Sequence, residues 1–418
     1  MLSALAATSS DDAVVSSAAS RAVQISAARL VTLSPSTRWH ILASMPASTR
    51  GRSRTDDSDA PKKRQKIEPQ EREGVPSVQI PKRAKEFWFD EGNVILAAKN
   101  RSFKVHTSVL MLRSEVLKKM LNGPALSRVS EKLDGCAVVR LDDDDRDIEG
   151  LLQIIYQGGN SPWFDSQKPP ILYVEFRAIV RIAVKYEVKD VVKEAKHRLS
   201  RVFPTDSLDN WDEYLQPDGK RTSITLVDTD CIDVLNLARL LNMRAILPLV
   251  FYACANMGDI AVLTQGWTFD EEDVRLSNDD LTLCLDGRDA LTEESTKILR
   301  PLLELAVASS QRPPDCSTPS RCRLAFEFLT LAAMDAGYLR DASALGGLND
   351  WLDEQGVKPN SKPCKHCDKA LKKAIDERRE ETWRTLGTIF DIPEWPAGQQ
   401  QNNNAPVAAP AASAAAAV

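Results

Sequence analysis

One segment in the first third of the chain constrains the fold more than any other. Residues 102–105 have the composition of a short strand, and a helical pattern follows directly. Ser114 suits the N-cap of a second helix, because serine favours that position and apolar residues recur behind it. Those apolar residues are Val116, Leu117, Met120 and Leu121. The segment therefore predicts a strand followed by two consecutive helices.

The flanking residues predict further strands and helices. Upstream, residues 87–97 read as two strands around the turn Asp90-Glu-Gly-Asn93, which predicts a β-hairpin. Downstream, Val138–Leu141 predicts a strand, and an acidic run at residues 142–147 leads into a helical pattern around Ile148. We interpret these carboxylates as N-capping groups that stabilise the start of that helix.

The order of these elements resembles the BTB/POZ fold. The pattern F-x-V-H-x-x-V-L-x-x-x-S runs from Phe103 to Ser114, and L-L-Q-I-I-Y and I-A-V-K-Y-E-V follow at residues 151–156 and 182–188. Together these motifs place a BTB/POZ-like domain at residues 86–201. The resemblance implies an α+β fold, with a small sheet capped by helices, and an interaction module rather than an enzyme.

The resemblance also implies an association surface on the predicted strand and helix pair. The residues expected to build it are Phe103, His106, Leu110, Ser114 and Met120. The implied partners are a second copy of this chain or another BTB protein. In dimeric transcription factors of the family, an acidic residue and an arginine form a charged pair at the positions that hold Asn93 and Thr107 here. That charged pocket is therefore absent.

A second class of partner is a cullin, since some BTB proteins are adaptors of cullin-RING ubiquitin ligases. Such adaptors often carry a hydrophobic-x-Glu motif after the second helix, and Val129-Ser-Glu131 fits this pattern. Three residues match easily by chance, so an ordinary polar loop between Gly123 and Gly135 is the competing interpretation.

Composition constrains the number of domains, the class of partner and the cellular compartment. A length of 418 residues favours two or three domains, and 43% hydrophobic residues suffice for real cores. A net charge of −5 does not demand a nucleic-acid or membrane partner, and no apolar run approaches the roughly 18 residues that span a bilayer. Eight cysteines in a chain of this length indicate a reducing compartment rather than a disulfide scaffold.

Residues 202–396 predict an all-helical extension, similar to the BACK-type regions that follow BTB domains. Helical patterns recur at residues 231–241, 290–309, 321–336 and 369–390. The end of the extension is similar to that of large sets of fungal BTB proteins. Its pattern residues are Arg379, Trp383, Leu386, Phe390, Pro393 and Trp395. A low-complexity tail, residues 397–418, is expected to be disordered.

Residues 1–85 predict a disordered leader and linker. A mitochondrial transit peptide is the alternative for the Ala- and Ser-rich start, although Asp11 and Asp12 speak against it. Within the linker, four cationic side chains suit a nuclear-import receptor, which predicts a nuclear or nucleocytoplasmic location. They are Lys62, Lys63, Arg64 and Lys66. The competing interpretation is a solvated charge cluster.

Four cysteines form a candidate structural zinc site, the single cofactor that the sequence suggests. Cys364 and Cys367 make a Cys-x-x-Cys pair, which presents two thiolates to one tetrahedral ion. Cys316 and Cys322 supply a second, more widely spaced pair, and His366 could replace one thiolate. Four ordinary reduced cysteines are the competing interpretation. The remaining cysteines lie in apolar segments and predict core packing.

Catalysis and nucleic-acid recognition find little support. The chain has four histidines, and no nucleophile pattern surrounds His106, which we expect to begin a helix. No small-molecule substrate is indicated. Direct DNA binding ranks last among the hypotheses, because the one dense basic cluster lies in the linker.

Overall fold

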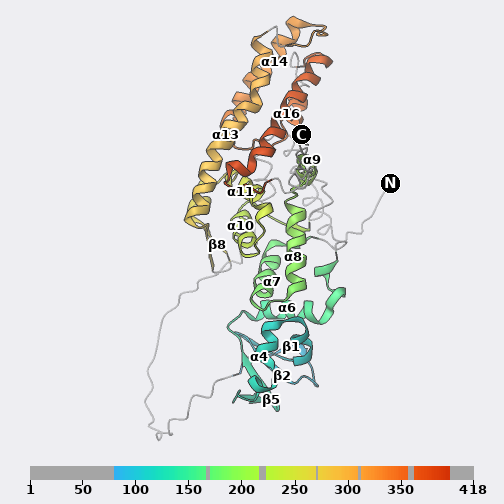
Figure 1. The fold of residues 1–418 in the computed structure, drawn as a ribbon, viewed down its shortest axis with the longest axis vertical. Coiled ribbons are helices and arrows are strands. Elements are labelled where there is room, and N and C mark those ends of the chain that lie inside the picture. The colour runs from blue at the N-terminus through green and yellow to red at the C-terminus, as the bar shows by residue number, and fades with distance from the viewer. Residues whose placement is uncertain are drawn as a thin grey trace, which may run out of the picture. The chain divides into compact units, whose positions relative to one another are not determined.

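A computed structural model describes residues 80–165, 170–215, 223–269, 272–308, 312–355 and 362–395 (Figure 1). The basic segment at residues 62–66, residues 1–79 of the predicted leader and the predicted tail at residues 397–418 lie outside these residues. Residues 80–85 of the predicted leader are described, and strand β1 (Lys82–Trp88) begins within them, so the prediction of disorder is wrong there. The chain divides into two compact units, and the division falls next to Arg198. Among the described residues, no helix is long and apolar enough to cross a membrane.

The first unit contains a five-stranded sheet in the order β1-β3-β2-β5-β4. The strands are β1 (Lys82–Trp88), β2 (Val94–Ala97), β3 (Arg101–Val105), β4 (Lys132–Leu133) and β5 (Cys136–Arg140). Strand β2 pairs antiparallel with β3 and parallel with β5. Strand β4 pairs antiparallel with β5.

The predicted hairpin of β1 and β2 is wrong. Its turn exists, since the Gly92 N–H donates to the Phe89 carbonyl at 3.0 Å. However, β1 pairs in parallel with β3, which therefore lies between β1 and β2. The turn chemistry fixed the local bend, whereas the pairing depended on a strand further along the chain.

Helices alternate with these strands and follow them along the chain, the last one continuing across the division between the units. They are α3 (Thr107–Arg113), α4 (Glu115–Leu121), α5 (Gly123–Leu126), α6 (Asp145–Gln157), α7 (Tyr173–Lys185) and α8 (Lys189–Val202). A short strand, β6 (Ile171–Leu172), precedes α7. All four residues of β2 are buried, which indicates that apolar groups cover both faces of the sheet. On one face, Ile80, Trp88 and Leu133 pack against a core cluster that includes Ile95 and Val138.

The helix starts follow the sequence predictions. The Ser114 hydroxyl accepts the Leu117 N–H at 2.9 Å and thereby caps α4. The Asp144 carboxylate accepts the Arg146 N–H at 2.9 Å and caps α6. Asp143 in the same acidic run accepts hydrogen bonds from Lys185 and from the Tyr186 hydroxyl. The N-capping interpretation is therefore confirmed for Asp144, whereas the Asp143 carboxylate binds Lys185 and Tyr186 instead.

The second unit is mostly helical. Its helices are α9 (Leu208–Leu215), α10 (Asp230–Leu240), α11 (Leu247–Ala255), α12 (Ile260–Gln265), α13 (Asn278–Val307), α14 (Pro319–Asp335), α15 (Leu348–Gln355) and α16 (Lys365–Ile389). Figure 1 shows the long helix α13 beside α14 and α16, both of which it contacts. The prediction of an all-helical extension needs one correction, because β8 (Trp267–Phe269) and β9 (Glu272–Val274) form an antiparallel hairpin. Strand β7 (Ile224–Thr225) is also present.

The end of α16 folds back and closes the second unit. The Trp395 indole N–H donates to the Trp383 carbonyl at 2.6 Å, and the two rings meet edge to face. Phe390 stacks on Phe251 of α11 with ring centroids 5.3 Å apart. Gly287 of α13 leaves room for this ring, since a Cβ there would overlap Phe390. Five of the six pattern residues near the C-terminus are thus buried, whereas Pro393 is exposed.

Candidate interaction surface and cysteine cluster

The predicted association residues divide into buried and accessible ones. Phe103 and Leu110 are fully buried and Ser114 nearly so, which means that they hold α3 and α4 in place from within. His106 and Met120 are half-buried. The most exposed of the large apolar side chains described in the first unit is Leu112 on α3, which is 85% exposed.

Leu112 was absent from the predicted set, although the sequence carried a signal for it. Leu110 and Leu112 are two positions apart, and side chains at that spacing do not share a helix face. Because Leu110 is buried, Leu112 has to point outward. Nearby positions on the two helices, Val109, Val116 and Met120, are half-buried. The helix pair therefore presents apolar side chains to solvent.

His106 has a structural role in an aromatic cluster. Its backbone N–H donates to the Tyr156 hydroxyl at 2.9 Å, and its ring Nδ1 lies 3.1 Å from the same oxygen. Phe89 stacks on Tyr156 with centroids 4.9 Å apart, and Phe87 lies 5.8 Å from that ring. Burial raises the pKa of Tyr156, although the His106 N–H acts in the opposite direction. These contacts fix the junction of β3 and α3.

Asn93 and Thr107 form a neutral pair where the resemblance placed a charged one. The Thr107 N–H donates to Asn93 Oδ1 at 2.8 Å, and Asn93 Nδ2 donates to the Thr107 hydroxyl at 3.0 Å. The asparagine thus satisfies the first backbone N–H of α3, which has no acceptor within the helix. The two side chains are neutral and hydrogen-bond to each other, so they present no charge to a partner.

The hydrophobic-x-Glu motif lies between α5 and β4. Val129 is half-buried, and the Glu131 carboxylate accepts two hydrogen bonds from the Arg140 guanidinium, at 2.7 and 3.0 Å. The Glu131 carbonyl accepts the Val138 N–H at 3.0 Å. Glu131 is therefore tied to β5 through both its side chain and its backbone.

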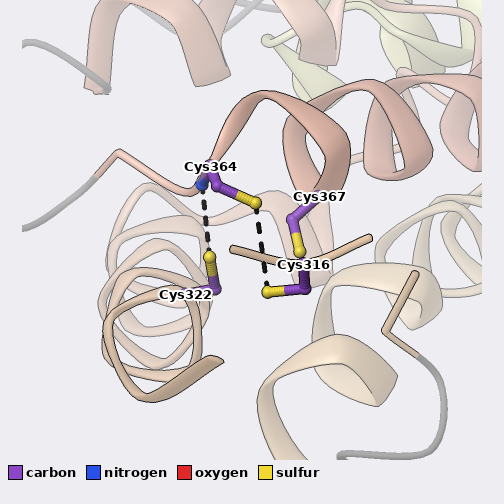
Figure 2. A group of neighbouring side chains, drawn as sticks. All are labelled: Cys316, Cys322, Cys364 and Cys367. Carbon is purple, nitrogen blue, oxygen red and sulfur yellow. Dashed lines mark hydrogen bonds between the residues drawn. The ribbon is translucent and has the colours of Figure 1, made fainter. Parts of the chain in front are cut away.

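Four cysteines converge in the second unit, as Figure 2 shows. The Sγ atoms of Cys316, Cys322, Cys364 and Cys367 all lie within 4.8 Å of one another. Cys364 is the N-cap of α16 and Cys367 lies in its first turn, while Cys322 lies in the first turns of α14. His366 of the intervening dipeptide is exposed and is not part of the cluster.

Hydrogen bonds and burial set the protonation of these thiols. Burial raises the pKa of Cys364, but backbone N–H groups of Cys367 and Ser317, together with the neighbouring thiols, lower it to about 6. Burial and hydrogen bonds with the Cys316 and Cys364 sulfurs raise the pKa of Cys367. Burial also raises the pKa of Cys316, against the effect of the Thr318 N–H. One thiolate therefore forms readily, and its negative charge disfavours the next.

The other four cysteines are buried, in agreement with the core packing predicted for them. Cys254 of α11 hydrogen-bonds with Cys231 and Cys284, and burial is the main cause of its raised pKa. Cys136 of β5 donates to the Gly92 carbonyl at 3.3 Å. These four cysteines therefore serve as buried packing groups.

Residues 85–201 match the family model for the BTB/POZ domain. The chain therefore contains a BTB/POZ domain, a kind of domain that acts in protein–protein interaction. No curated protein and no solved structure gives a significant match to the chain. The likeness of the second unit to fungal BTB extensions stays a prediction.

Proposed function

We propose that this protein is a non-catalytic interaction protein whose BTB/POZ domain binds a second copy of the chain or another BTB/POZ protein in the nucleus. The observation that carries the proposal is the solvent-facing Leu112 on the helix pair α3–α4. Burying one leucine contributes about 1.5–3 kcal/mol. In a symmetric dimer each copy buries its own Leu112, because the same surface patch of both copies meets at the two-fold axis.

The neutral Asn93–Thr107 pair supports an apolar mode of association. In its place the resemblance put an acid and an arginine, which would add an electrostatic contribution to dimer formation. Here the two side chains satisfy each other's hydrogen bonds. The affinity is therefore expected to come from Val109, Leu112, Val116 and Met120 rather than from charges.

Light scattering of the purified full-length chain tests this proposal. The wild-type chain is expected to have the mass of a dimer, and Leu112→Asp is expected to shift it to a monomer, because the dimer would bury an uncompensated carboxylate. Val307→Asp is the matched control, since Val307 is 84% exposed on α13 of the second unit. A monomeric wild-type chain, or a Leu112→Asp chain that still dimerises, would contradict self-association. In the first case, capture of a second BTB/POZ protein tests the hetero-association that remains.

The alternative function is that of a substrate adaptor in a cullin-RING ubiquitin ligase, and it rests on Val129 and Glu131. The Arg140 guanidinium already holds the Glu131 carboxylate, so cullin contact through Glu131 would have to share or break that ion pair. Mixing the full-length chain with a cullin N-terminal fragment tests this function. A complex that Glu131→Ala abolishes would favour the adaptor over the association module.

The nuclear location rests on Lys62, Lys63, Arg64 and Lys66, which lie outside the described residues. A fluorescent fusion of the full-length chain is expected to accumulate in nuclei and to lose this accumulation when all four residues are changed to alanine. Mitochondrial fluorescence of the wild-type fusion would instead support the transit-peptide alternative.

A further inference from the structure

We propose that Cys316, Cys322, Cys364 and Cys367 bind one structural zinc ion through four thiolates. This proposal concerns the second unit and is independent of association through Leu112. It begins from the convergence of two cysteine pairs that lie far apart in the sequence, one at the start of α14 and one at the start of α16 (Figure 2).

The distances between the sulfurs suit a tetrahedral ion. A Zn–S bond of about 2.3 Å places the sulfurs of a regular tetrahedron about 3.8 Å apart. The Cys364 and Cys316 Sγ atoms are 3.9 Å apart, and no pair in the cluster exceeds 4.8 Å. A disulfide requires about 2.05 Å, and all four cysteines are free thiols. Small rotations about the side-chain bonds bring all four sulfurs onto one ion.

Donors surrounding the sulfurs favour the thiolate form that a metal needs. The Cys364 N–H donates to the Cys322 sulfur at 3.2 Å, and the Thr318 hydroxyl lies 3.4 Å from the same atom. Backbone N–H groups of Cys367 and Ser317 point at the Cys364 sulfur. Such second-layer donors orient metal ligands and stabilise their negative charge. A buried thiol in an apolar core has no need of them.

Charge supplies the reason why an ion should be present. Four thiolates within 4.8 Å of one another would repel one another strongly. A divalent cation at the centre removes the repulsion and displaces the protons. Cys322 and Cys367 are buried, while Cys316 and Cys364 are partly exposed, so the cluster has an open side through which an ion can enter.

Four protein ligands leave no open coordination position, which is characteristic of structural rather than catalytic zinc. The ion would join the starts of α14 and α16 and the loop that carries Cys316. It would therefore hold the N-terminal ends of α14 and α16 together.

Metal content of the full-length chain, purified without chelator, tests the proposal. We expect one zinc per chain by inductively coupled plasma mass spectrometry, and release of that zinc when a mercurial reagent titrates the thiols. Cys364→Ser and Cys367→Ser are each expected to lower the zinc content at least tenfold. Cys136→Ser is the matched control, because it removes a buried thiol of the first unit and should keep one zinc.

A second measurement protects the test against variants that fail to fold. Replacing the metal of the wild-type chain with Co²⁺ is expected to give the intense visible bands of tetrahedral cobalt–thiolate coordination. A wild-type chain without zinc or cobalt bands would overturn the proposal. So would a disulfide between Cys316 and Cys364 in the freshly purified chain, or iron in place of zinc.

Discussion

Arg379 shows how a single side chain organises the second unit. The residue is 6% exposed, and its guanidinium donates to Asp212 Oδ1 at 2.6 Å and to the Leu345 carbonyl at 2.8 Å. Burial raises the pKa of Asp212, although the arginine lowers it. One side chain of α16 is thus joined to α9 and to the segment before α15.

Replacing Arg379 with methionine is expected to lower the free energy of unfolding by about 3 kcal/mol, since it leaves Asp212 half-buried without its cation. Arg378→Met is the matched control. Arg378 is exposed and pairs with Glu381, so its loss should change stability by about 0.5 kcal/mol or less. Urea unfolding followed by tryptophan fluorescence measures both. Equal effects of the two substitutions would show that the buried position of Arg379 is irrelevant.

The buried carboxyl group of Asp230 is expected to make the stability of the fold depend on pH. Burial raises its pKa to about 6, repulsion from Asp233 and Asp228 adds to this, and the Val227 N–H opposes it. The folded state thus favours the protonated carboxyl. Stability from this group is fully present below the unfolded pKa of about 3.9 and is lost as pH rises through about 6.

Asp230→Asn should remove this pH dependence, because an amide does not ionise. The hydrogen bond is kept, since the amide oxygen can still accept the Val227 N–H. We expect the variant to exceed the wild-type chain in stability by on the order of 2 kcal/mol at pH 7 and to match it near pH 3.5. Urea unfolding across this pH range measures the difference between the two chains. A difference that does not vary with pH would contradict the assigned pKa.

At the scale of elements, two helical glycines should respond in opposite ways to the same substitution. A Cβ at Gly287 of α13 would overlap the Phe390 ring, whereas a Cβ at Gly150 of α6 meets only Ile179 at 3.8 Å. Gly287→Ala is therefore expected to destabilise the chain by about 1–3 kcal/mol through overpacking. Gly150→Ala should stabilise it by about 0.5–1 kcal/mol through helix propensity. Thermal unfolding of the two variants tests this contrast, and a stabilised Gly287→Ala would refute the packing of Phe390 on α13.

The elements also mark where sequence reasoning succeeded and where it failed. Periodicity predicted α10, α14 and α16, because a helix with one buried stripe repeats its apolar residues every three or four positions. It did not predict β8 and β9, whose three-residue strands are too short to show alternation. The predicted hairpin of β1 and β2 was wrong because β1 pairs with β3. The turn that follows β1 does not by itself determine which strand pairs with it.

At the scale of the whole molecule, the sequence showed which residues to examine but not which of them meet. The two cysteine pairs and Arg379 were all conspicuous in the sequence. Their partners were not, because 42 positions separate Cys322 from Cys364 and 167 separate Asp212 from Arg379. Contacts of this kind come from the packing of α13 with α14 and α16, which no local pattern encodes. The solvent-facing position of Leu112 was predictable in principle from its spacing to Leu110.

The separation of Asp212 and Arg379 also has a consequence for the protein as it is made. At roughly 5–20 residues per second, a ribosome adds the 167 positions between them in on the order of 10–30 s. The BTB/POZ domain has left the ribosome by then, whereas the second unit still lacks the arginine and the aromatic rings that close it. If the proposed self-association through Leu112 holds, nascent chains translated from one messenger would therefore meet through this residue first. Assembly would then precede completion of the fold, and neighbouring ribosomes rather than free diffusion would decide which copies pair.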